Sequence, residues 1–353
     1  MPGALDGVTV IELAGLGPVP FAGMMLADHG ARVIRIARRA GGGLAAVLDD
    51  CDVLGRNREV VHLNLKDPGG IVRLRALINT ADAFIEGFRP GVLERLGLAP
   101  EVLLADNPRL VIGRMTGWGQ DGPLAARAGH DINYIALSGA LHMYGLGKPA
   151  APVNVVGDFG GGGMMLAFGV LAGILSARAT GQGQVIDCAM SEGAALLSAM
   201  QYGLHGGGRW VDDRQSNQID GAAHYYDTYQ TADGLWIAVG ALEPQFYAML
   251  IDRMGLAGDP DFAGQGSRAD WPRLSERLAG VFRTRTRAEW SALLEGCDAC
   301  FAPVLSLAEA PLHPHNQARE AFVTAGGIVQ PAPVPRFSRT PAPPVRMGEG
   351  RTP

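Results

Sequence analysis

The sequence predicts an α/β protein with a large, Rossmann-like parallel-sheet domain and a smaller α+β domain. Strand-like apolar runs alternate with helical patterns over roughly the first 190 residues, which is typical of repeated strand–helix units. A predicted hairpin followed by three helices begins at residue 225 and indicates a separate fold. The chain has 353 residues, of which 47% are hydrophobic, and this length and composition allow two buried cores.

The first strand–helix unit is expected at the start of the chain. Apolar runs predict strands at residues 8–13 and 32–36, with a glycine- and proline-rich loop at 15–20 and a helix at 21–30 between them. The loop lacks the GxGxxG spacing of dinucleotide-binding loops, and its prolines are expected to break the entry into the helix. The loop therefore does not indicate a bound dinucleotide.

The remaining elements set the predicted domain boundaries. We expect further strands of the large domain at residues 60–65, 83–86, 110–114 and 184–188, with helices at 70–79, from 92 onward and at 191–202. We expect strands of the small domain at 225–230, 235–239 and 301–305, with helices at 244–254, 271–282 and 287–295. The predicted boundaries are 1–203 for the large domain, 204–224 for a linker, 225–310 for the small domain, and 311–353 for a C-terminal segment that returns to the large domain. The proline-rich tail at 331–344 is expected to run over the surface without regular structure.

One acidic residue stands where a loop meets an apolar helix. Asp158 precedes the glycines Gly160–Gly163, and the apolar run continues to Ala177. Backbone N–H groups at a helix start lack partners and carry positive dipole, so they suit a developing anion, and glycines allow a substrate to approach closely. The alternative is that Asp158 only caps the helix.

The same run raises the question of a membrane span. Residues 160–177 carry no charge and reach about the 18 residues that a short span needs. The first four of them are glycines, and Asp158 and Arg178 bracket the run closely. We therefore expect a buried helix that packs through Gly169 and Gly173, and no membrane association.

Charge and cysteine content exclude several classes of partner. The net charge is −5 with a pI near 5.9, which argues against nucleic-acid or anionic-membrane binding. Cys297 and Cys300 have CxxC spacing, but a zinc site needs two further ligands nearby, so no metal site is predicted. The N-terminus lacks the basic-then-apolar pattern of a secretory signal, and a cytoplasmic protein is expected.

Several motifs together resemble the family III CoA transferases. They are Glu86-Gly87-Phe88-Arg89-Pro90-Gly91, Arg114-Met115-Thr116-Gly117-Trp118-Gly119-Gln120, Gly129-His130-Asp131-Ile132-Asn133-Tyr134, Gly157-Asp158-Phe159-Gly160-Gly161-Gly162, Tyr225-Tyr226-Asp227-Thr228-Tyr229 and Glu243-Pro244-Gln245-Phe246-Tyr247. The resemblance covers nearly the whole chain. Within this family the chain looks like one of the racemases, which act on 2-methylacyl-CoA thioesters in lipid metabolism.

The resemblance implies a two-base mechanism. His130 and Asp158 match the family positions that flank the α-carbon of an acyl-CoA, where one group removes the proton and the other returns a proton to the opposite face. The thioester oxygen would lie near backbone N–H groups around Asp158. Glu243 matches a family position near the histidine that sets its orientation or charge. No cofactor is expected, because the thioester itself is the electron sink and CoA is part of the substrate.

The resemblance also implies the binding partners. The positions carried over to CoA binding in the large domain are Arg38, Leu63, Asn64, Leu65, Lys66, Gly87, Arg89, Arg95, Gly129, Asp131, Ile132, Asn133 and Tyr134. The family implies an interlocked homodimer, and the segments 204–223 and 322–344 are long enough to pass round a partner. We expect Glu243 to complete the site of the partner chain. The loop at 41–50 matches no motif of the family.

Two other functions remain open from the sequence. In a CoA transferase, Asp158 would be a nucleophile that forms an anhydride and then an enzyme thioester. His130 argues for the racemase, because such transferases need no proton shuttle at this point. A non-catalytic acyl-CoA-binding protein would not need His130, Asp158 and Glu243 together. The acyl chain is not specified, because apolar pockets discriminate by only about 1–3 kcal/mol per methylene.

Overall fold

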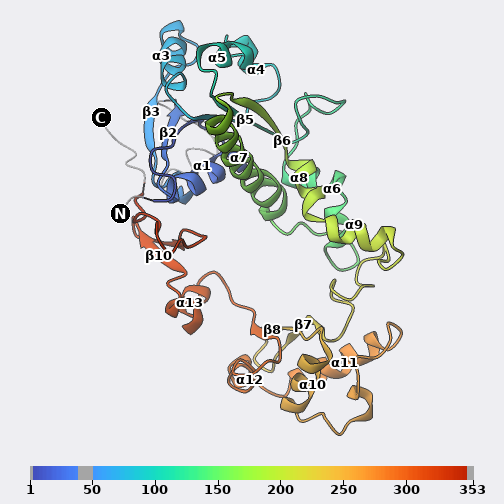
Figure 1. Cartoon of the computed structure of the whole chain (residues 1–353). Helices are drawn as coiled ribbons and strands as arrows, with labels where there is room; N and C mark the ends of the chain where they lie inside the picture. The colour runs from blue at the N-terminus through green and yellow to red at the C-terminus, as the bar shows by residue number, and fades with distance from the viewer. Residues whose placement is uncertain (1–2, 39–50, 348–353) are drawn as a thin grey trace. The chain divides into compact units, whose positions relative to one another are not determined.

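The computed structural model describes residues 3–38 and 51–347, and these residues form two compact units. Unit 1 contains the described residues up to Leu141, together with Ala151–Ala199 and those from Gln317 onward. Unit 2 contains His142–Ala150 and Met200–Asn316 (Figure 1). The segment at 204–224, expected as a linker, is grouped with unit 2, and so is a short insertion at 142–150 that the sequence did not indicate. The loop at 41–50 lies outside the described residues.

Unit 1 is built on a parallel sheet. Within the described residues the sheet has six strands in the order β3-β2-β1-β4-β5-β6, and every neighbouring pair is parallel. The strands are β1 (Thr9–Leu13), β2 (Arg32–Ala37), β3 (Glu59–His62), β4 (Ala83–Glu86), β5 (Val111–Thr116) and β6 (Gln184–Ala189). This is the strand order of a doubly wound Rossmann-like sheet, so the predicted fold class is confirmed. The winding reverses between β1 and β4, and the loops after these two strands therefore diverge and leave a crevice.

Helices cover both faces of this sheet (Figure 1). In the described part of the chain before residue 200, the helical segments are α1 (Pro18–Asp28), η1 (Val53–Gly55), α3 (Pro68–Ile78), α4 (Val92–Arg95), α5 (Pro100–Asp106), α6 (Asp131–Leu137), η2 (Ala140–Met143), the π-helix η3 (Val155–Met164), α7 (Met165–Thr180), α8 (Met190–Leu197) and the start of α9 (Ala199–Gly206). Alternate strand residues face opposite cores: Val10 packs in the core with α1 and α7, whereas Ile11 packs in the core with α3, α4 and α5. Burial of both faces explains the near-continuous apolar strands.

The first helix begins earlier than the sequence indicated. α1 begins at Pro18 rather than at residue 21, and its prolines lie in the first turn. The first-turn N–H groups have no intrahelical partner, so the missing proline N–H removes no hydrogen bond, and the fixed proline φ suits a helix. The prolines therefore start this helix instead of breaking it.

The segment at 322–344, which was expected to pass round a partner, begins with a hairpin that the sequence did not indicate. Strands β10 (Phe322–Ala325) and β11 (Ile328–Pro331) pair antiparallel, after α13 (Pro314–Ala318). Arg56 donates to the Gln330 side chain at 2.9 Å and to the Pro331 carbonyl at 2.8 Å, and it also pairs with Asp28. These bonds fix the hairpin on unit 1, and only the chain after Pro331 has the irregular structure that its prolines predicted.

Unit 2 is an α+β fold with an aromatic core. Its antiparallel strands are β7 (Tyr226–Gln230), β8 (Trp236–Gly240) and β9 (Phe301–Pro303), and its other helical segments are α10 (Pro244–Arg253), η4 (Pro260–Phe262), α11 (Trp271–Phe282), α12 (Arg287–Leu294) and η5 (Ala310–Leu312). The rings of Tyr229 and Phe282 stack with centroids 5.0 Å apart, and Trp290 packs edge-on against Phe282. The predicted small-domain elements are all present within a few residues of the expected bounds.

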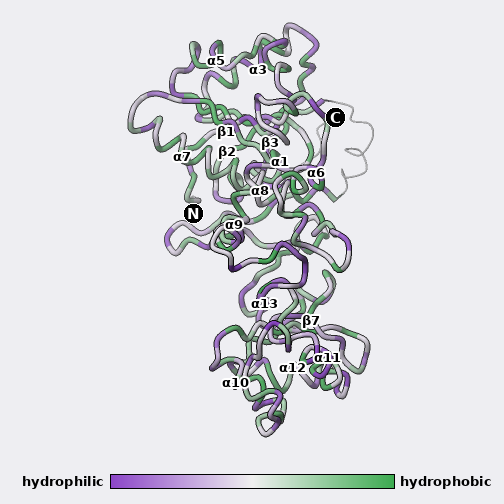
Figure 2. The backbone as a smooth tube through the Cα atoms, turned by 90° about the vertical axis from the view of Figure 1, so that its right-hand side faces the viewer, coloured by the Kyte–Doolittle hydropathy of each residue, from purple (hydrophilic) through white to green (hydrophobic). Residues whose placement is uncertain are grey.

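The apolar stretch that raised the membrane question is a long helix of unit 1. Val155–Thr180 is apolar and long enough to cross a membrane, and 44% of its most apolar window is buried; core helices can pass the same test. Figure 2 colours most of α7 as hydrophobic. Gly173 lets α7 approach Val111 of β5, because an added Cβ would lie 2.7 Å from that side chain. The opposite face, with Phe168 and Leu175, is exposed, so the expected burial holds for one face only.

Candidate active site

A cavity of about 330 Å3 opens in unit 1 at the crevice between β1 and β4. Its walls are the loops that follow β1, β4 and β5, together with the segment that leads into α6. Arg89 and His130 both line it. A crevice at the carboxyl ends of the strands, where the winding reverses, is where open α/β sheets bind ligands.

Asp158 is in the first turn of η3 and does not itself line this cavity, but its carboxylate lies against Gly17, whose neighbours Leu16 and Pro18 do. Its Oδ2 is 3.1 Å from the point where a Cβ on Gly17 would be, and Gly17 has a φ of 71°, so only glycine suits this position. The Asn154 side chain donates to the same Oδ2 at 3.1 Å. Burial raises the pKa of Asp158; the Asn154 bond lowers this pKa, the Asp131 charge raises it, and the His130 charge lowers it. His130 and Asp158 thus act on each other electrostatically.

The surroundings of Asp158 differ from both sequence-based interpretations of the helix start. Asn154, not Asp158, is the N-cap residue, so Asp158 is not a simple cap. The glycines after it serve helix packing: Gly161 meets the backbone of α8 at Gly193 and Ala194, and Gly163 meets α1 at Pro18 and Phe21. Added Cβ atoms at these two glycines would lie within 2.6–2.8 Å of the neighbouring atoms, which no side chain tolerates. The glycine run therefore lets η3 pack closely between α1 and α8, and it does not leave space for a substrate.

The backbone N–H groups of Gly157 and Asp158 are already hydrogen-bonded. Oδ1 of Asp131 accepts from the Gly157 N–H and from the Asp158 N–H, each at 2.8 Å. Asp131 is 7% exposed and lies on α6, immediately after His130. A carboxylate therefore occupies these two N–H groups, and the expectation that N–H groups around Asp158 hold the thioester oxygen stays a prediction.

His130 is the N-cap residue of α6 and its side chain is exposed. Its backbone N–H donates to the Asn133 side chain at 3.0 Å, which fixes the start of the helix. Tyr134 is buried, and its hydroxyl donates to the Gly129 carbonyl. Its ring packs edge-on against Trp118, with the ring centroids 4.8 Å apart. Several side chains predicted to bind CoA in this segment therefore also shape the loop that presents His130, whereas Ile132 is exposed.

The other predicted CoA positions follow the carboxyl ends of neighbouring strands. Arg38 follows β2, the residues 63–66 follow β3, and Gly87 and Arg89 follow β4, so the parallel topology brings them to one edge of the sheet. Arg38, Lys66 and Arg89 are exposed. Leu63 packs in the core and Leu65 against it, so these two are available to a ligand mainly through their backbone.

Two buried side chains, Glu86 and Arg114, hold the loop that follows β4 in place. Glu86 is fully buried, and its carboxylate accepts from the Phe88 N–H at 2.6 Å and from the Arg114 guanidinium at 3.1 Å. Burial is the main effect on the pKa of Glu86 and raises it. Arg95, on α4, lies against Gly91, since an added Cβ there would be 3.2 Å from Nη1. Two motif residues, Glu86 and Arg114, therefore position the loop that carries Arg89.

Comparison with known proteins agrees with this geometry. Residues 5–349 match CoA-transferase family III. The chain belongs to this family. It is 45% identical over 343 residues to the alpha-methylacyl-CoA racemase of Mus musculus, with 96% of this chain and 88% of that protein covered. The Homo sapiens protein of the same name is 44% identical over 342 residues, with the same coverage. The resemblance inferred from the motifs is confirmed.

A solved structure supports the same fold. A CAIB/BAIF family protein from Brucella suis superposes with a TM-score of 0.84 at 24% identity, with 97% of this chain and 95% of that chain covered. At this identity the likeness concerns the fold alone.

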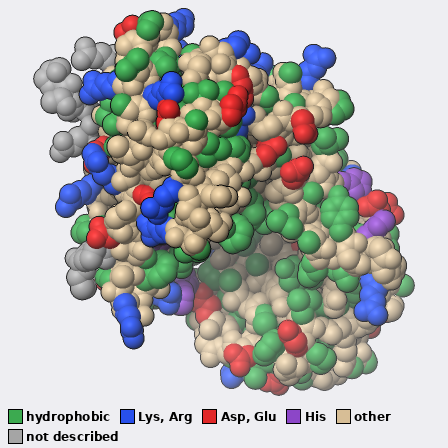
Figure 3. All heavy atoms as spheres, turned by 45° about the horizontal axis from the view of Figure 1, so that its top comes forward, with side chains coloured by type: hydrophobic (Ala, Val, Ile, Leu, Met, Phe, Trp, Pro, Cys, Tyr) green, Lys and Arg blue, Asp and Glu red, His purple; other side chains and the backbone are tan. Residues whose placement is uncertain are grey.

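On the face drawn in Figure 3, the described Lys and Arg side chains are scattered among acidic and apolar ones and form no continuous basic surface.

Glu243 belongs to unit 2, so its expected place near a histidine of unit 1 stays a prediction. It is the N-cap residue of α10, its side chain is exposed, and its charge helps to raise the pKa of Cys300, after the larger effect of burial. Among residues 3–38 and 51–347, no group of three His, Cys, Asp or Glu side chains is placed to hold a metal ion.

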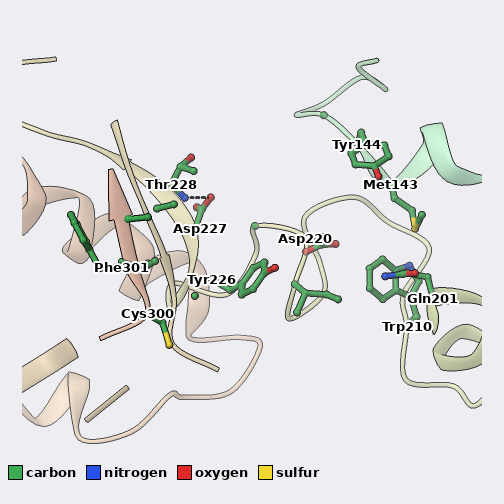
Figure 4. A pocket seen from close by; sticks show the side chains of 17 residues that line it. Met143, Tyr144, Gln201, Trp210, Asp220, Tyr226, Asp227, Thr228, Cys300 and Phe301 are labelled. Carbon is green, nitrogen blue, oxygen red and sulfur yellow. Dashed lines mark hydrogen bonds between the residues drawn. The ribbon is translucent and has the colours of Figure 1, made fainter. Parts of the chain in front are cut away.

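Unit 2 contains a larger hollow of about 690 Å3 that was not predicted, although its lining includes Tyr226, Asp227 and Thr228 of the motif at 225–229 (Figure 4). Trp210, Tyr226 and Phe301 line it together with Asp220 and Asp227, and no described residue of its lining is basic. Burial raises the pKa of Asp227, a Thr228 N–H bond lowers it, and the Asp220 charge raises it. Such a wall does not suit the phosphates of CoA. None of the predicted site residues lines this hollow.

Proposed function

We propose that this chain is an isomerase that interconverts (2R)- and (2S)-2-methylacyl-CoA thioesters by 1,1-proton transfer through an enolate. The observation that carries the proposal is that His130 lines the crevice of unit 1 and that its chain neighbour Asp131 accepts a hydrogen bond from the Asp158 N–H, which brings the two groups into one region. The identity to curated racemases supports the choice of substrate class. The two side chains act as the acid–base groups on the two faces of the α-carbon.

The chemistry follows from the environments of the two groups. A base and an acid work best when their pKa values lie near the working pH. Burial moves the pKa of Asp158 upward from the usual aspartate value, which makes it both a better base and an accessible acid. In one direction Asp158 removes the α-proton and His130 donates one; in the other direction the roles exchange. The planar enolate between them has no configuration.

The charge on the thioester oxygen needs hydrogen-bond donors other than the Gly157 and Asp158 N–H groups, which already donate to Asp131. The N–H groups of Asn133 and Tyr134 donate to the His130 carbonyl, at 2.8 Å and 3.3 Å. The first-turn N–H groups of Asp131 and Ile132 have no acceptor within the helix and lie directly beside His130. We assign the oxygen to these two N–H groups. No metal or further cofactor is needed, because the thioester carbonyl takes up the electron pair.

We propose that CoA binds along the carboxyl edge of the sheet. Arg89 at β4, Arg38 at β2 and Lys66 at β3 supply cations along one line of strand ends. Phosphates bind such side chains through charge-assisted hydrogen bonds. The thioester would then lie at the crevice beside β1 and β4, with the nucleotide toward β3.

The direct test is incubation of the protein with one 2-methylacyl-CoA epimer in deuterated water. The proposal predicts that both epimers appear and that both carry deuterium at the α-carbon. Recovery of the starting epimer without deuterium, from folded protein, would refute the activity. A matched incubation with a straight-chain acyl-CoA reports α-exchange without epimers and separates binding of CoA from recognition of the methyl branch.

The alternative is transfer of CoA, the reaction that names the family. It would make Asp158 a nucleophile and leave His130 without a proton to carry. Incubation with acyl-CoA, trapping with hydroxylamine and mass spectrometry of the peptide that contains Asp158 distinguish the two. A racemase gives no mass change at this residue, and a hydroxamate there would favour the transferase.

We also propose that the protein is a homodimer in which Glu243 completes the site of the partner. Exposed apolar side chains on α7 and α8, among them Phe168, Leu175, Leu196 and Leu197, offer a surface for a second copy. The test is co-expression of His130→Ala with Glu243→Ala, each with its own affinity tag. A heterodimer collects both defects in one site and none in the other, so it regains activity that neither parent has. A purified heterodimer no more active than its parents would mean that each site is built within one chain.

A further inference from the structure

We infer that Asp131 is a positioning residue that holds Asp158 at a fixed place relative to His130. This inference rests on the proposed function, since it concerns the same two groups. It assigns to Asp131 a role other than CoA binding. The pair of neighbours His130–Asp131 on α6 is joined to the pair Gly157–Asp158 on η3 through one carboxylate oxygen.

The contact is short, buried and shared. Oδ1 of Asp131 accepts two N–H groups at 2.8 Å, from Gly157 and from Asp158 itself. The other oxygen, Oδ2, is buried and has no hydrogen-bond partner among the described residues. Asp131 is 7% exposed, and its Oδ1 already accepts two N–H groups, so it is poorly available to the phosphates or the pantetheine of a substrate. Repulsion also disfavours a carboxylate as a phosphate ligand.

Gly157 is shaped to this contact. A Cβ on Gly157 would lie 2.5 Å from Oδ1 and 3.1 Å from Cγ of Asp131, and 3.1 Å from a methyl group of Ile135. The glycine is buried and its φ is not in the left-handed region, so close approach rather than backbone conformation requires it. Hydrogen bonds and close packing therefore hold the dipeptides His130–Asp131 and Gly157–Asp158 together, although 26 and 27 residues separate the bonded positions.

A carboxylate at this place has an electrostatic consequence as well. The groups that interact with Asp158 are Asp131, His130 and Tyr134 from α6 and the neutral Asn154 before η3. Of these, the Asp131 charge raises the pKa of Asp158, in addition to the larger effect of burial. Replacement of Asp131 by asparagine keeps an acceptor oxygen but removes the charge, so the two contributions of Asp131 separate.

The test uses full-length Asp131→Asn and Asp131→Ala, with Asp121→Asn, an exposed carboxylate of the same unit, as the matched control. Amide hydrogen exchange should show faster exchange at Gly157 and Asp158 in Asp131→Ala, by tenfold or more, and less change in Asp131→Asn. In epimerisation, kcat should fall about tenfold or more in Asp131→Ala with KM within about threefold, because positioning and not binding is lost. Asp121→Asn should match the wild type in both measurements.

The pH profile separates positioning from a general loss of structure. In the direction in which Asp158 removes the proton, the acid limb of kcat/KM should move to lower pH in Asp131→Asn, because a negative charge is gone. Raised KM with unchanged kcat and unchanged amide exchange would overturn the inference and return Asp131 to CoA binding. If Asp131→Ala does not fold, amide exchange in the wild-type protein decides: exchange at Gly157 and Asp158 as fast as at exposed amides overturns the positioning contact, and an unshifted acid limb in Asp131→Asn overturns the charge contribution.

The proposed function and this inference fail in different ways. Wild-type protein that neither epimerises nor exchanges α-protons in deuterated water refutes the activity. The amide exchange of Gly157 and Asp158 needs no substrate and still decides whether Asp131 holds η3.

Discussion

Two regions at the carboxyl edge of the unit 1 sheet differ in burial and hydrogen bonding. The acid–base end, which comprises His130, Asp131, Gly157 and Asp158, lies at the crevice and is held by buried 2.8 Å hydrogen bonds and tightly packed glycines. The basic end, which comprises Arg38 and Lys66, follows β2 and β3 and carries exposed side chains. Both ends lie at the carboxyl edge of the same parallel sheet.

The difference matches what each end would have to do. Proton transfer requires reacting atoms within hydrogen-bond reach, and an error of about 1 Å costs about a hundredfold in rate. Long cationic side chains adapt to a phosphate through several rotamers, so exposure is no disadvantage there. We therefore expect substitutions at the acid–base end to lower kcat and substitutions at the basic end to raise KM.

The largest effect is expected from the two acid–base groups themselves. His130→Ala and Asp158→Asn should each lower the rate of epimerisation by roughly 10²–10⁴, since positioned acid–base groups contribute that much. The measurement is the rate of inversion of each epimer, followed by chiral analysis of the acyl group. Circular dichroism of each variant controls for folding. Inversion near the wild-type rate in either folded variant would contradict the two-base mechanism.

A smaller loss is expected when the acid–base end is only displaced. Gly157→Ala puts a Cβ 2.5 Å from the Asp131 carboxylate, so η3 must shift, and kcat should fall roughly 10- to 100-fold. Gly280→Ala is the matched control, because nothing lies within 4 Å of its added Cβ and it sits inside α11. Equal turnover in the two variants would mean that the tight contact at Gly157 has no part in catalysis.

The smallest effect is expected at the basic end. Lys66→Ala should raise KM for acyl-CoA about two- to fivefold and leave kcat unchanged, because exposed charge pairs contribute about 0.2–1 kcal/mol. The increase should shrink at high salt. Arg73→Ala, another exposed cation but on α3, is the control. A truncated acyl-pantetheine substrate should show no difference between Lys66→Ala and wild type, and a KM change with that substrate would remove Lys66 from phosphate binding.

Much of this arrangement could be predicted from the sequence, because it depends on local pattern. The alternation of strand and helix from β1 to β6 carried enough signal for the fold class. The motifs around Gly87, His130 and Asp158 all fall at strand ends or helix starts, where chemistry collects in such folds. The hairpin at 322–331 was missed because its strands are short and a proline-rich tail follows it.

The parts that the sequence did not reveal depend on contacts between distant segments. The hydrogen bonds that the Gly157 and Asp158 N–H groups donate to Asp131 join residues far apart in the chain, and nothing local distinguishes Asp131 from a solvated first-turn acid. The glycines of η3 were interpreted as room for substrate, whereas α1 and α8 fill that room. Prolines at the start of α1 were interpreted as helix breakers because the exact first residue of a helix is not encoded by periodicity. The available signal of close packing was the glycine that precedes each acid–base candidate, Gly129 before His130 and Gly157 before Asp158.

The central claim is that His130 and Asp158 serve opposite faces of the α-carbon, and isotope exchange in the single variants tests it most directly. Each 2-methylacyl-CoA epimer is incubated in deuterated water with His130→Ala and, separately, with Asp158→Asn. In His130→Ala, only the epimer whose α-proton faces Asp158 should exchange, and it should keep its configuration. In Asp158→Asn, only the opposite epimer should exchange. Exchange of the same epimer in both variants, or exchange of both epimers in either one, would contradict the account.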